Sequence, residues 1–392
     1  MKQSSLPIPD PTSQSHSRML SACIKDMIEK SGGSIGFDQY MNSVLYQPDL
    51  GYYSSNIQKF GFTGDFITAP IVSPLFSKCL AYQCSQVLDE IKDSAILEIG
   101  AGNGVMAKDL LLELQERDSL PNKYYIFEVS LSLEKAQKKL LKKFLPEYID
   151  NIIWLNTLSK KKFNGLVLAN EVLDSLPVKR FKKELNIFKE MKVTFSENRF
   201  HWINEIADSN LAEDLKKLES NLPSPFPNDY YSEINIQLKE WINKIQLTIE
   251  QGVILFIDYG YSTLDYYHPS RSDGNLLCHY QHHVHNNPFF YPGLQDITTS
   301  VNFTAVAQHA EEIGLDVKGY TNQAYFLLGC GIDDLVADDN FSDIQSQIKI
   351  SQQLKKLIMP EEMGERFKVI ALTKKYDKEL LCFSKMNQID RL

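Results

Sequence analysis

Three glycines at alternate positions follow an apolar run and are the clearest chemical signal in the chain. Residues 95–100 read AILEIG, the pattern of a buried strand, and they lead into Gly100, Gly102 and Gly104. Glycine lets the backbone turn tightly and approach a ligand with no Cβ in the way, and the N–H groups of a following helix face such a ligand. A dinucleotide-binding loop would place its third glycine at position 105, where Val105 stands. The loop therefore predicts a nucleotide-like ligand that has no pyrophosphate to cradle.

Two carboxylates indicate which nucleotide-like ligand the loop binds. The glycine spacing is typical of the loop in which methyltransferases hold the methionine part of S-adenosyl-L-methionine, and Glu98 is placed to accept hydrogen bonds from its ammonium group or from loop amides. Glu128 ends the next predicted strand, where such enzymes place a carboxylate that binds the ribose hydroxyls. Taken alone, the glycine loop has a plain tight turn as its alternative, and Glu128 has a solvent-exposed acid at a strand end. Together, the features predict S-adenosyl-L-methionine as the cofactor.

A third motif, 170-NEVLDSLP-177, follows the fourth predicted strand and concerns the methyl acceptor. Ligands of open α/β sheets bind at the carboxyl ends of the strands, so Asn170 and Glu171 are expected beside the acceptor. Glu171 and Asp174 are three residues apart, on one face of a helical turn. A carboxylate can pair with one edge of a guanidinium and draw positive charge away from the attacking nitrogen. The alternative is that these acids lie at a helix N-terminus and only interact favourably with the helix dipole.

A histidine-rich segment, residues 279–304, is the fourth candidate. It offers no cysteine or acid at ligand spacing with its histidines, so we predict no metal site and interpret the segment as a mobile loop that closes over the acceptor. Asp258 and Tyr259, at the end of the fifth predicted strand, are expected to face the same crevice. The histidines are His279, His282, His283 and His285.

The elements that must position these residues alternate in the βαβ manner, which predicts a mostly parallel sheet with helices on both faces. Strands are expected at 95–100, 123–129, 151–155, 164–170 and 252–260, and helices at 73–91, 104–117 and 131–143. A hairpin (187–195 with 200–203) and two polar helices within 208–249 interrupt this rhythm. After them we expect helices at 304–313, 323–330 and 341–357, and strands at 315–320, 367–373 and 379–384.

The domain organisation follows from these patterns. The Ser-, Pro- and Gln-rich start predicts a disordered tail, and the aromatic, glycine-rich stretch 36–70 predicts a lid rather than a core element. Residues 261–297 have no strand or helix pattern and are expected to be a substrate loop. The predicted parts are a flexible tail (1–18), an N-terminal helical lobe (19–91), the first part of the cofactor domain (92–183), an insertion (184–250) and the remainder of that domain (251–392).

The composition and the N-terminal sequence indicate which partners the protein binds and in which compartment it works. The net charge of −9 argues against non-specific binding of nucleic acid. No run approaches the ~18 consecutive apolar residues of a membrane span, so no membrane insertion is expected. The six cysteines are scattered, which predicts reduced thiols. The N-terminus lacks a secretory core and is a poor presequence, which favours a bacterial cytoplasm, with the mitochondrial matrix as the alternative.

With these motifs the chain resembles the MidA-like family of class I methyltransferases, whose mitochondrial members assist respiratory complex I assembly by methylating a subunit arginine. The resemblance implies a class I (Rossmann-like) fold with an N-terminal lobe and an inserted hairpin and helix segment, and protein arginine N-methylation. It also implies that Asp65, Thr68 and Asp296 line the acceptor site, and a protein substrate such as a subunit of a complex I-type enzyme. The matching motifs are 61-GFTGDFITAP-70, 98-EIGAGNG-104, 127-FEVS-130, 169-ANEVLDSLPV-178, 257-IDYG-260, 280-YQHHVHNNPFFYPGLQDIT-298 and 358-IMPEEMGERFKVI-370.

The sequence departs from the family pattern at Ile71, Asn275 and Asn302, near segments expected to contact the substrate. These departures leave the cofactor motifs untouched and leave the identity of the acceptor open. Two further alternatives stand beside the enzyme: a non-catalytic assembly factor with the same fold, and a nicotinamide-dependent oxidoreductase, which Val105 disfavours. Whether the chain forms a homodimer also stays open.

Overall fold

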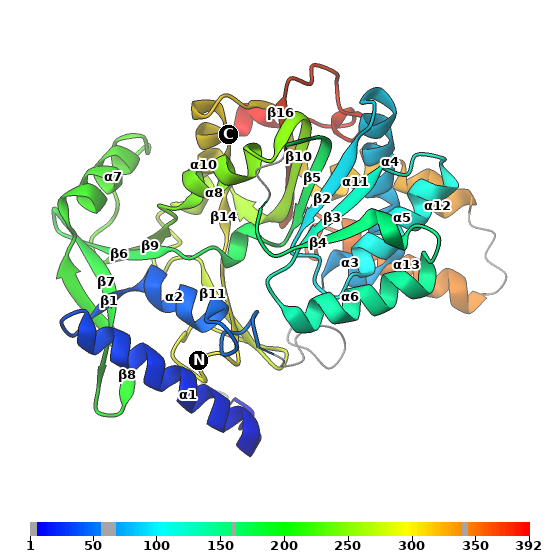
Figure 1. The fold of residues 1–392 in the computed structure, drawn as a ribbon. Helices are drawn as coiled ribbons and strands as arrows, with labels where there is room; N and C mark the ends of the chain where they lie inside the picture. The colour runs from blue at the N-terminus through cyan, green and yellow to red at the C-terminus, as the bar shows by residue number, and fades with distance from the viewer. Residues whose placement is uncertain (1–5, 56–67, 159–161, 339–343) are drawn as a thin grey trace. The chain divides into compact units, whose positions relative to one another are not determined.

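The computed structural model describes residues 6–55, 68–158, 162–338 and 344–392. The chain divides into two compact units, each assembled from separate segments of the sequence (Figure 1). The first unit comprises Met1–Phe66, Asp174–Leu238 and Tyr261–Ser300, and the second comprises Ile67–Leu173, Lys239–Gly260 and Val301–Leu392.

The second unit is built on a sheet that has eight strands within the described residues, in the order β15-β16-β10-β5-β2-β3-β4 with β14 beside β10 (Figure 1). The strands from β4 to β10 are parallel to their neighbours, whereas β16 is antiparallel to both β10 and β15. This confirms the predicted α/β class with a mostly parallel sheet. The strands are β2 (Ala95–Ile99), β3 (Lys123–Phe127), β4 (Ile152–Leu155), β5 (Phe163–Asn170), β10 (Ile249–Tyr261), β14 (Val301–Asn302), β15 (Asp316–Asn322) and β16 (Phe367–Lys374).

Helices cover this sheet because its strands carry apolar side chains on both faces. All five residues of β2 are buried, and α4 and α5 pack together in a shared apolar core with Ile96 and Leu166 of neighbouring strands. The helices are α3 (Ala69–Val72), α4 (Pro74–Glu90), α5 (Val105–Glu116), α6 (Leu131–Phe144), α8 (Leu238–Gln246), α10 (Phe303–Glu312), α11 (Gln323–Gly329), α12 (Ile332–Asp338) and α13 (Ile344–Ile358), with short 3₁₀ turns η1 (Ile149–Asn151), η2 (Leu173–Ser175), η3 (Leu381–Phe383) and η4 (Ile389–Arg391).

The first unit has two antiparallel sheets within its described part. One has the order β1-β7-β6-β9, and β8 also pairs with β7. The other has the order β12-β11-β13. Their core includes Phe37, Tyr40 and Val44 together with Leu20 and Ile24. The elements are α1 (Pro11–Lys30), β1 (Ile35–Gly36), α2 (Phe37–Tyr46), β6 (Lys179–Glu184), β7 (Ile187–Ser196), β8 (Arg199–Ile206), α7 (Ser209–Ser220), β9 (Tyr230–Ile234), α9 (Thr263–Tyr266), β11 (Leu276–Tyr280), β12 (His283–His285) and β13 (Asp296–Thr299).

Several expectations for the first unit are wrong. Residues 11–18 are helical rather than a disordered tail, because the Asp10 carboxylate accepts hydrogen bonds from the first-turn amides and Pro11 suits a first helical position. Residues 37–46 form a helix whose apolar side chains are buried, that of Tyr46 only partly, so this part of the predicted lid is core. The predicted loop 261–297 contains α9 and strands β11 to β13.

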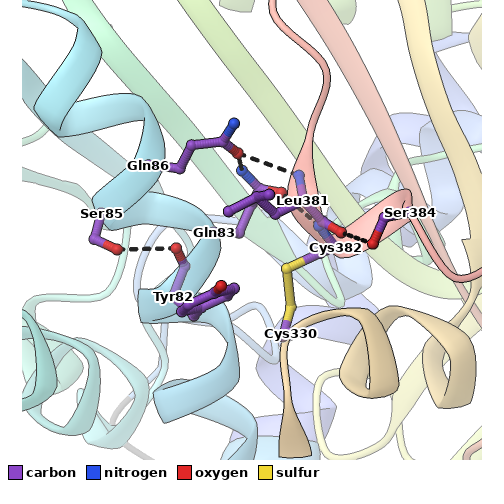
Figure 2. The surroundings of a disulfide bond; sticks show 8 residues. All are labelled: Tyr82, Gln83, Ser85, Gln86, Cys330, Leu381, Cys382 and Ser384. Carbon is purple, nitrogen blue, oxygen red and sulfur yellow. Dashed lines mark hydrogen bonds between the residues drawn. A yellow bond between two sulfur atoms is a disulfide. The ribbon is translucent and has the colours of Figure 1, made fainter.

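The C-terminal region also differs from expectation. The strand predicted at 379–384 is the 3₁₀ turn η3, and Cys382 within it forms a disulfide with Cys330 at the end of α11 (Figure 2). The prediction of reduced thiols is therefore wrong for this pair, whose 52-residue separation gave no paired spacing to notice. The Cys382 amide donates to the Gln83 side-chain oxygen of α4 at 3.0 Å, which anchors the turn to that helix (Figure 2).

Candidate functional site

The glycine loop leaves the end of β2 in a conformation that side chains resist. Gly100, Gly102 and Gly104 have φ angles of +69°, +54° and +80°. A Cβ on Gly104 would lie 3.1 Å from Cγ of Gln137, and one on Gly100 would lie 3.2 Å from Cγ2 of Val172. Because the left-handed region costs other residues about 1–2 kcal/mol, glycine is needed here for both conformation and space. The loop ends where α5 begins, so the N–H groups of its first turn point toward the loop; that of Val105 donates to the Asn103 side chain at 3.1 Å.

Glu98 lies in β2 directly before this loop and is only 1% exposed. Its carboxyl accepts a hydrogen bond of 2.7 Å from the hydroxyl of Tyr124 on β3. Burial raises the pKa of Glu98 to about 7, an effect that the Tyr124 hydrogen bond opposes and the charge of Glu128 reinforces. A cationic group brought against this carboxyl would favour its ionised form.

Glu128 follows β3 and is held by hydrogen bonds of 2.9 Å from the Ser130 amide and of 2.9 Å from the Gln137 side chain. Gln137, a fully buried residue of α6, also donates to the Gly102 carbonyl at 2.8 Å and accepts from the Trp154 indole at 2.9 Å. It therefore joins the expected ribose carboxylate to the glycine loop. Sequence reasoning missed Gln137, because a single glutamine within a helical pattern carries no motif.

The topology places two loops beside each other at the carboxyl edge of the sheet. From β2 the chain runs outward through β3 and β4, then returns to add β5 and β10 on the other side of β2 (Figure 1). The switch point thus lies between β2, which leads into Gly100, and β5, which ends at Asn170. Ligands of open α/β sheets bind at this position.

Asn170 and Glu171 occupy this switch point in an unusual backbone. Glu171 has φ +54°, and its amide donates to the Ile257 carbonyl at 2.8 Å. The helical turn predicted to carry Glu171 and Asp174 begins only at Leu173, so they do not share its face. Oδ1 of Asn170 is buried and accepts no hydrogen bond from any described residue, whereas its Nδ2 donates to Glu171 at 3.2 Å. A non-glycine residue at positive φ is uncommon and often marks a functional site.

Asp258 of β10 supports this backbone. Its Oδ2 accepts from the amides of Val172 and Leu173 at 3.1 and 2.9 Å, and its Oδ1 accepts from the Tyr259 amide at 2.9 Å. The carboxylate is 1% exposed, so these hydrogen bonds form in a dry environment. The sequence placed Asp258 in this crevice, and the structure shows that it fixes the loop after Glu171.

Asp174 and Asp296 belong to the first unit, where both are buried. The Tyr53 hydroxyl donates to Asp296 at 2.9 Å, and the ring of Tyr53 stacks on that of Tyr46 with centroids 5.5 Å apart. Burial, with the charges of Asp296 and Asp174, raises the pKa of Tyr53 well above its usual value. The two acids therefore share an aromatic environment. Asp65 lies outside the described residues, and Thr68 is the residue before α3.

The histidine-rich segment folds as strands β11 and β12 with a tight turn between them, and so is not the structureless loop that we predicted. Burial lowers the pKa of His279 and of His285, and each also lies near another histidine. In the described part of the chain, no cluster of three His, Cys, Asp or Glu side chains could hold a metal ion. In the same part, no helix combines the length and apolar character needed to cross a membrane.

Comparison with known proteins agrees with this geometry. Residues 79–321 match the family described as S-adenosyl-L-methionine-dependent methyltransferase. The chain is 27% identical over 374 residues to the protein arginine methyltransferase NDUFAF7, mitochondrial, of Danio rerio, spanning 87% of this chain and 83% of that one. The human protein of the same name is 26% identical over 374 residues, spanning 88% of this chain and 81% of that one.

Solved structures extend the similarity over the whole fold. The crystal structure of a protein from Burkholderia thailandensis bound to S-adenosyl-homocysteine is 36% identical, with a TM-score of 0.93 over 99% of this chain and 100% of that one. A second crystal structure from the same organism is 35% identical, with a TM-score of 0.90 over the same shares of the two chains.

Proposed function

We propose that this chain, which belongs to the family of S-adenosyl-L-methionine-dependent methyltransferases, methylates an arginine nitrogen of a protein substrate. The family match covers more than half of the sequence, and S-adenosyl-L-methionine is the cofactor. The arginine acceptor is supported by curated relatives that are named protein arginine methyltransferases and are 26–27% identical.

The residues after β2 and β3 fit the cofactor. The left-handed glycines let the loop turn tightly between Gln137 and Val172, where a Cβ would press on either side chain, and this suits a loop whose backbone runs beside the methionine part of the cofactor. Glu128, held in place by Gln137, would accept from the ribose hydroxyls, and Glu98 would face the cationic side of the methionine part. When bound, the cofactor supplies a methyl group on a positively charged sulfur.

The observation that carries the acceptor proposal is the polar pair after β5. The buried Asn170 Oδ1 is an acceptor without a described donor, beside the Glu171 carboxylate. A guanidinium carries five N–H donors, can satisfy a carboxylate along one edge and still leaves one nitrogen to attack. That nitrogen forms its bond to the methyl carbon as the carbon–sulfur bond breaks; the electron pair of the broken bond stays on the sulfur, and one proton of the nitrogen passes to water. Glu171 would stabilise the positive charge on the other two nitrogens.

Asp174, Asp296 and Asp65 are proposed to assist in binding the arginine. The shared environment of Asp174 and Asp296 with two stacked tyrosines supports this for those two acids, because aromatic rings and carboxylates both favour a cation. The resemblance to the MidA-like family supports a subunit of a complex I-type enzyme as the protein substrate, and the curated relatives are named mitochondrial. The proposed compartment is a bacterial cytoplasm or, alternatively, the mitochondrial matrix.

Glu171→Gln tests the proposal. The amide keeps the shape of the side chain and removes its charge, so calorimetric titration should give a cofactor Kd within about twofold of the wild type, while methyl transfer should fall at least about 100-fold. Transfer is measured with methyl-labelled cofactor on a protein extract, followed by acid hydrolysis and chromatography for methylarginine. Glu361→Gln, at an exposed position, is the matched control and should transfer normally.

The alternatives give different results in the same assay. Label in lysine, histidine or a small molecule would refute arginine as the acceptor while leaving the methyltransferase assignment intact. Full activity of Glu171→Gln would refute the role of that residue. A wild-type protein that gives no heat with S-adenosyl-L-methionine would instead support a non-catalytic assembly factor.

A further inference from the structure

The first unit contains an open groove of about 1070 Å³ that the proposed function does not use. Its walls are one face of α1, strand β8 and residues 286–292, all of which belong to the first unit. Helix α1 contributes Arg18, Ser21, Ala22 and Lys25, a spacing that places these side chains on one face. The groove is therefore formed within a single compact unit.

The groove is basic although the protein is acidic. Its lining includes four basic residues, Arg18, Lys25, Arg180 and Arg199, and one acidic residue, Asp273, while the whole chain has a net charge of −9. Arg18, Lys25 and Arg199 stand at the solvent-exposed rim. Exposed cations of this kind can form ion pairs with an anionic partner.

Two of the rim cations lie beside exposed acids. Lys25 lies 3.8 Å from Glu29, and Arg199 lies 3.1 Å from Glu197. All four of these side chains are about half exposed or more, and ion pairs in water contribute little and exchange readily. The rim cations can therefore pair with a carboxylate brought by a partner.

The floor of the groove is aromatic and preorganised. The Trp202 ring lies 4.9 Å from Phe37 and 4.9 Å from Phe289, and the Arg180 guanidinium lies over it at 5.2 Å. Buried Glu233, 3.2 Å from Arg180, compensates the charge of that arginine. Since neighbours already pack against the Trp202 ring, the floor suits apolar side chains better than a stacked nucleic-acid base.

We propose that this α1–β8 groove binds an acidic segment of a partner protein, with an apolar or aromatic side chain on the floor and carboxylates at the rim. Its open volume of about 1070 Å³ lies at the upper end of the roughly 300–1,000 Å³ of small-molecule pockets and can hold a few residues of polypeptide. This binding function is independent of which residue the protein methylates.

The test uses a fluorescein-labelled dodecapeptide in which Glu and Asp alternate with Phe and Leu. A second peptide replaces the acids by Lys, and a labelled oligothymidine is the nucleic-acid probe. Fluorescence anisotropy measures binding to the wild type, to Arg18→Glu/Lys25→Glu and to Lys216→Glu/Lys217→Glu. The last pair changes exposed lysines of α7, so it alters the net charge equally without touching the groove.

The acidic peptide should bind the wild type and the α7 control alike, and the Arg18→Glu/Lys25→Glu variant at least about tenfold more weakly. Arg18→Gln/Lys25→Gln should lie between them, and circular dichroism and cofactor titration check that each variant is folded. Equal binding of the acidic peptide by the groove variant and the wild type would overturn the proposal. Preferential binding of oligothymidine, lost in the groove variant, would overturn it in favour of nucleic acid. Self-association lost in the groove variant, without peptide binding, would overturn it in favour of a second copy.

Discussion

Glu98→Gln should remove a pH-dependent loss of stability that the buried carboxyl imposes on the cofactor-free protein. The folded protein raises the pKa of Glu98 from an ordinary 4.5 to about 7, mainly through burial. An acid whose pKa is raised on folding holds its proton more tightly in the folded state. Its contribution to stability is therefore fully present below pH 4.5 and is lost as the pH rises through about 7.

The size of the effect follows from the two pKa values. They differ by about 2.5 pH units, and each unit corresponds to about 1.4 kcal/mol, so the cofactor-free protein should lose about 3 kcal/mol between pH 4.5 and pH 7 through this group. Glutamine mimics the neutral acid and can still accept the hydrogen bond of Tyr124. The variant should therefore keep the stability that the wild type has at low pH.

Urea unfolding of both proteins from pH 5 to pH 8, without cofactor, measures this difference. Other groups titrate alike in the two proteins and cancel when the free energies of unfolding are subtracted. Tyr124→Phe provides an internal check, because it removes a hydrogen bond that lowers the pKa of Glu98 and should move the loss to higher pH. A difference between wild type and Glu98→Gln that does not change with pH would show that Glu98 is not the buried titrating group.

Three further outcomes test other parts of the second unit. Gly104→Ala should destabilise the protein by about 1–2 kcal/mol in urea unfolding and weaken the calorimetric cofactor affinity, because φ is +80° and the new Cβ would press on Gln137 at 3.1 Å. Asp258→Asn, which offers an NH₂ group to amides that now meet a carboxylate, should lower kcat at least about tenfold with the cofactor Kd nearly unchanged; a cofactor affinity that fell as much as kcat would contradict a role confined to the acceptor loop. Replacing Cys330 and Cys382 by serine should cost about 2–4 kcal/mol in non-reducing buffer and nothing under reduction, where unfolding midpoints that still differed would assign the loss to packing instead.

The second unit was largely predictable because its strands and helices have clear hydrophobic patterns within short stretches of the sequence. Strands buried on both faces are continuous apolar runs, such as β2, and the glycines at its end mark the loop without any tertiary information. The residues proposed to hold the cofactor were chosen from the sequence for the same reason. Gln137 was missed because its importance comes from the packing of α6 against the loop, which no local pattern records.

The first unit was less predictable because its elements meet only through the fold. Helix α2 is buried by residues distant in sequence, and strands β11 to β13 are short and rich in polar side chains, so neither gives a clear period. The left-handed backbone of Glu171 is equally invisible in the sequence, since the restraint comes from the Ile257 carbonyl and the Asp258 carboxylate on a strand more than 80 residues later. Parts of the site that lie within one stretch of the sequence can thus be predicted from it, whereas parts that depend on contacts with distant strands cannot.

The position of β16 inside the sheet has a consequence for how the protein is made. This strand lies between β15 and β10, yet it ends at residue 374 of 392. At roughly 5–20 residues per second, about 5–20 s of translation separate the end of β10 at residue 261 from the end of β16. Throughout that time the nascent chain carries a long apolar strand with an unpaired edge, a template for aggregation. A ribosome that stops before residue 367 should therefore release an insoluble chain, even though every cofactor motif has been synthesised.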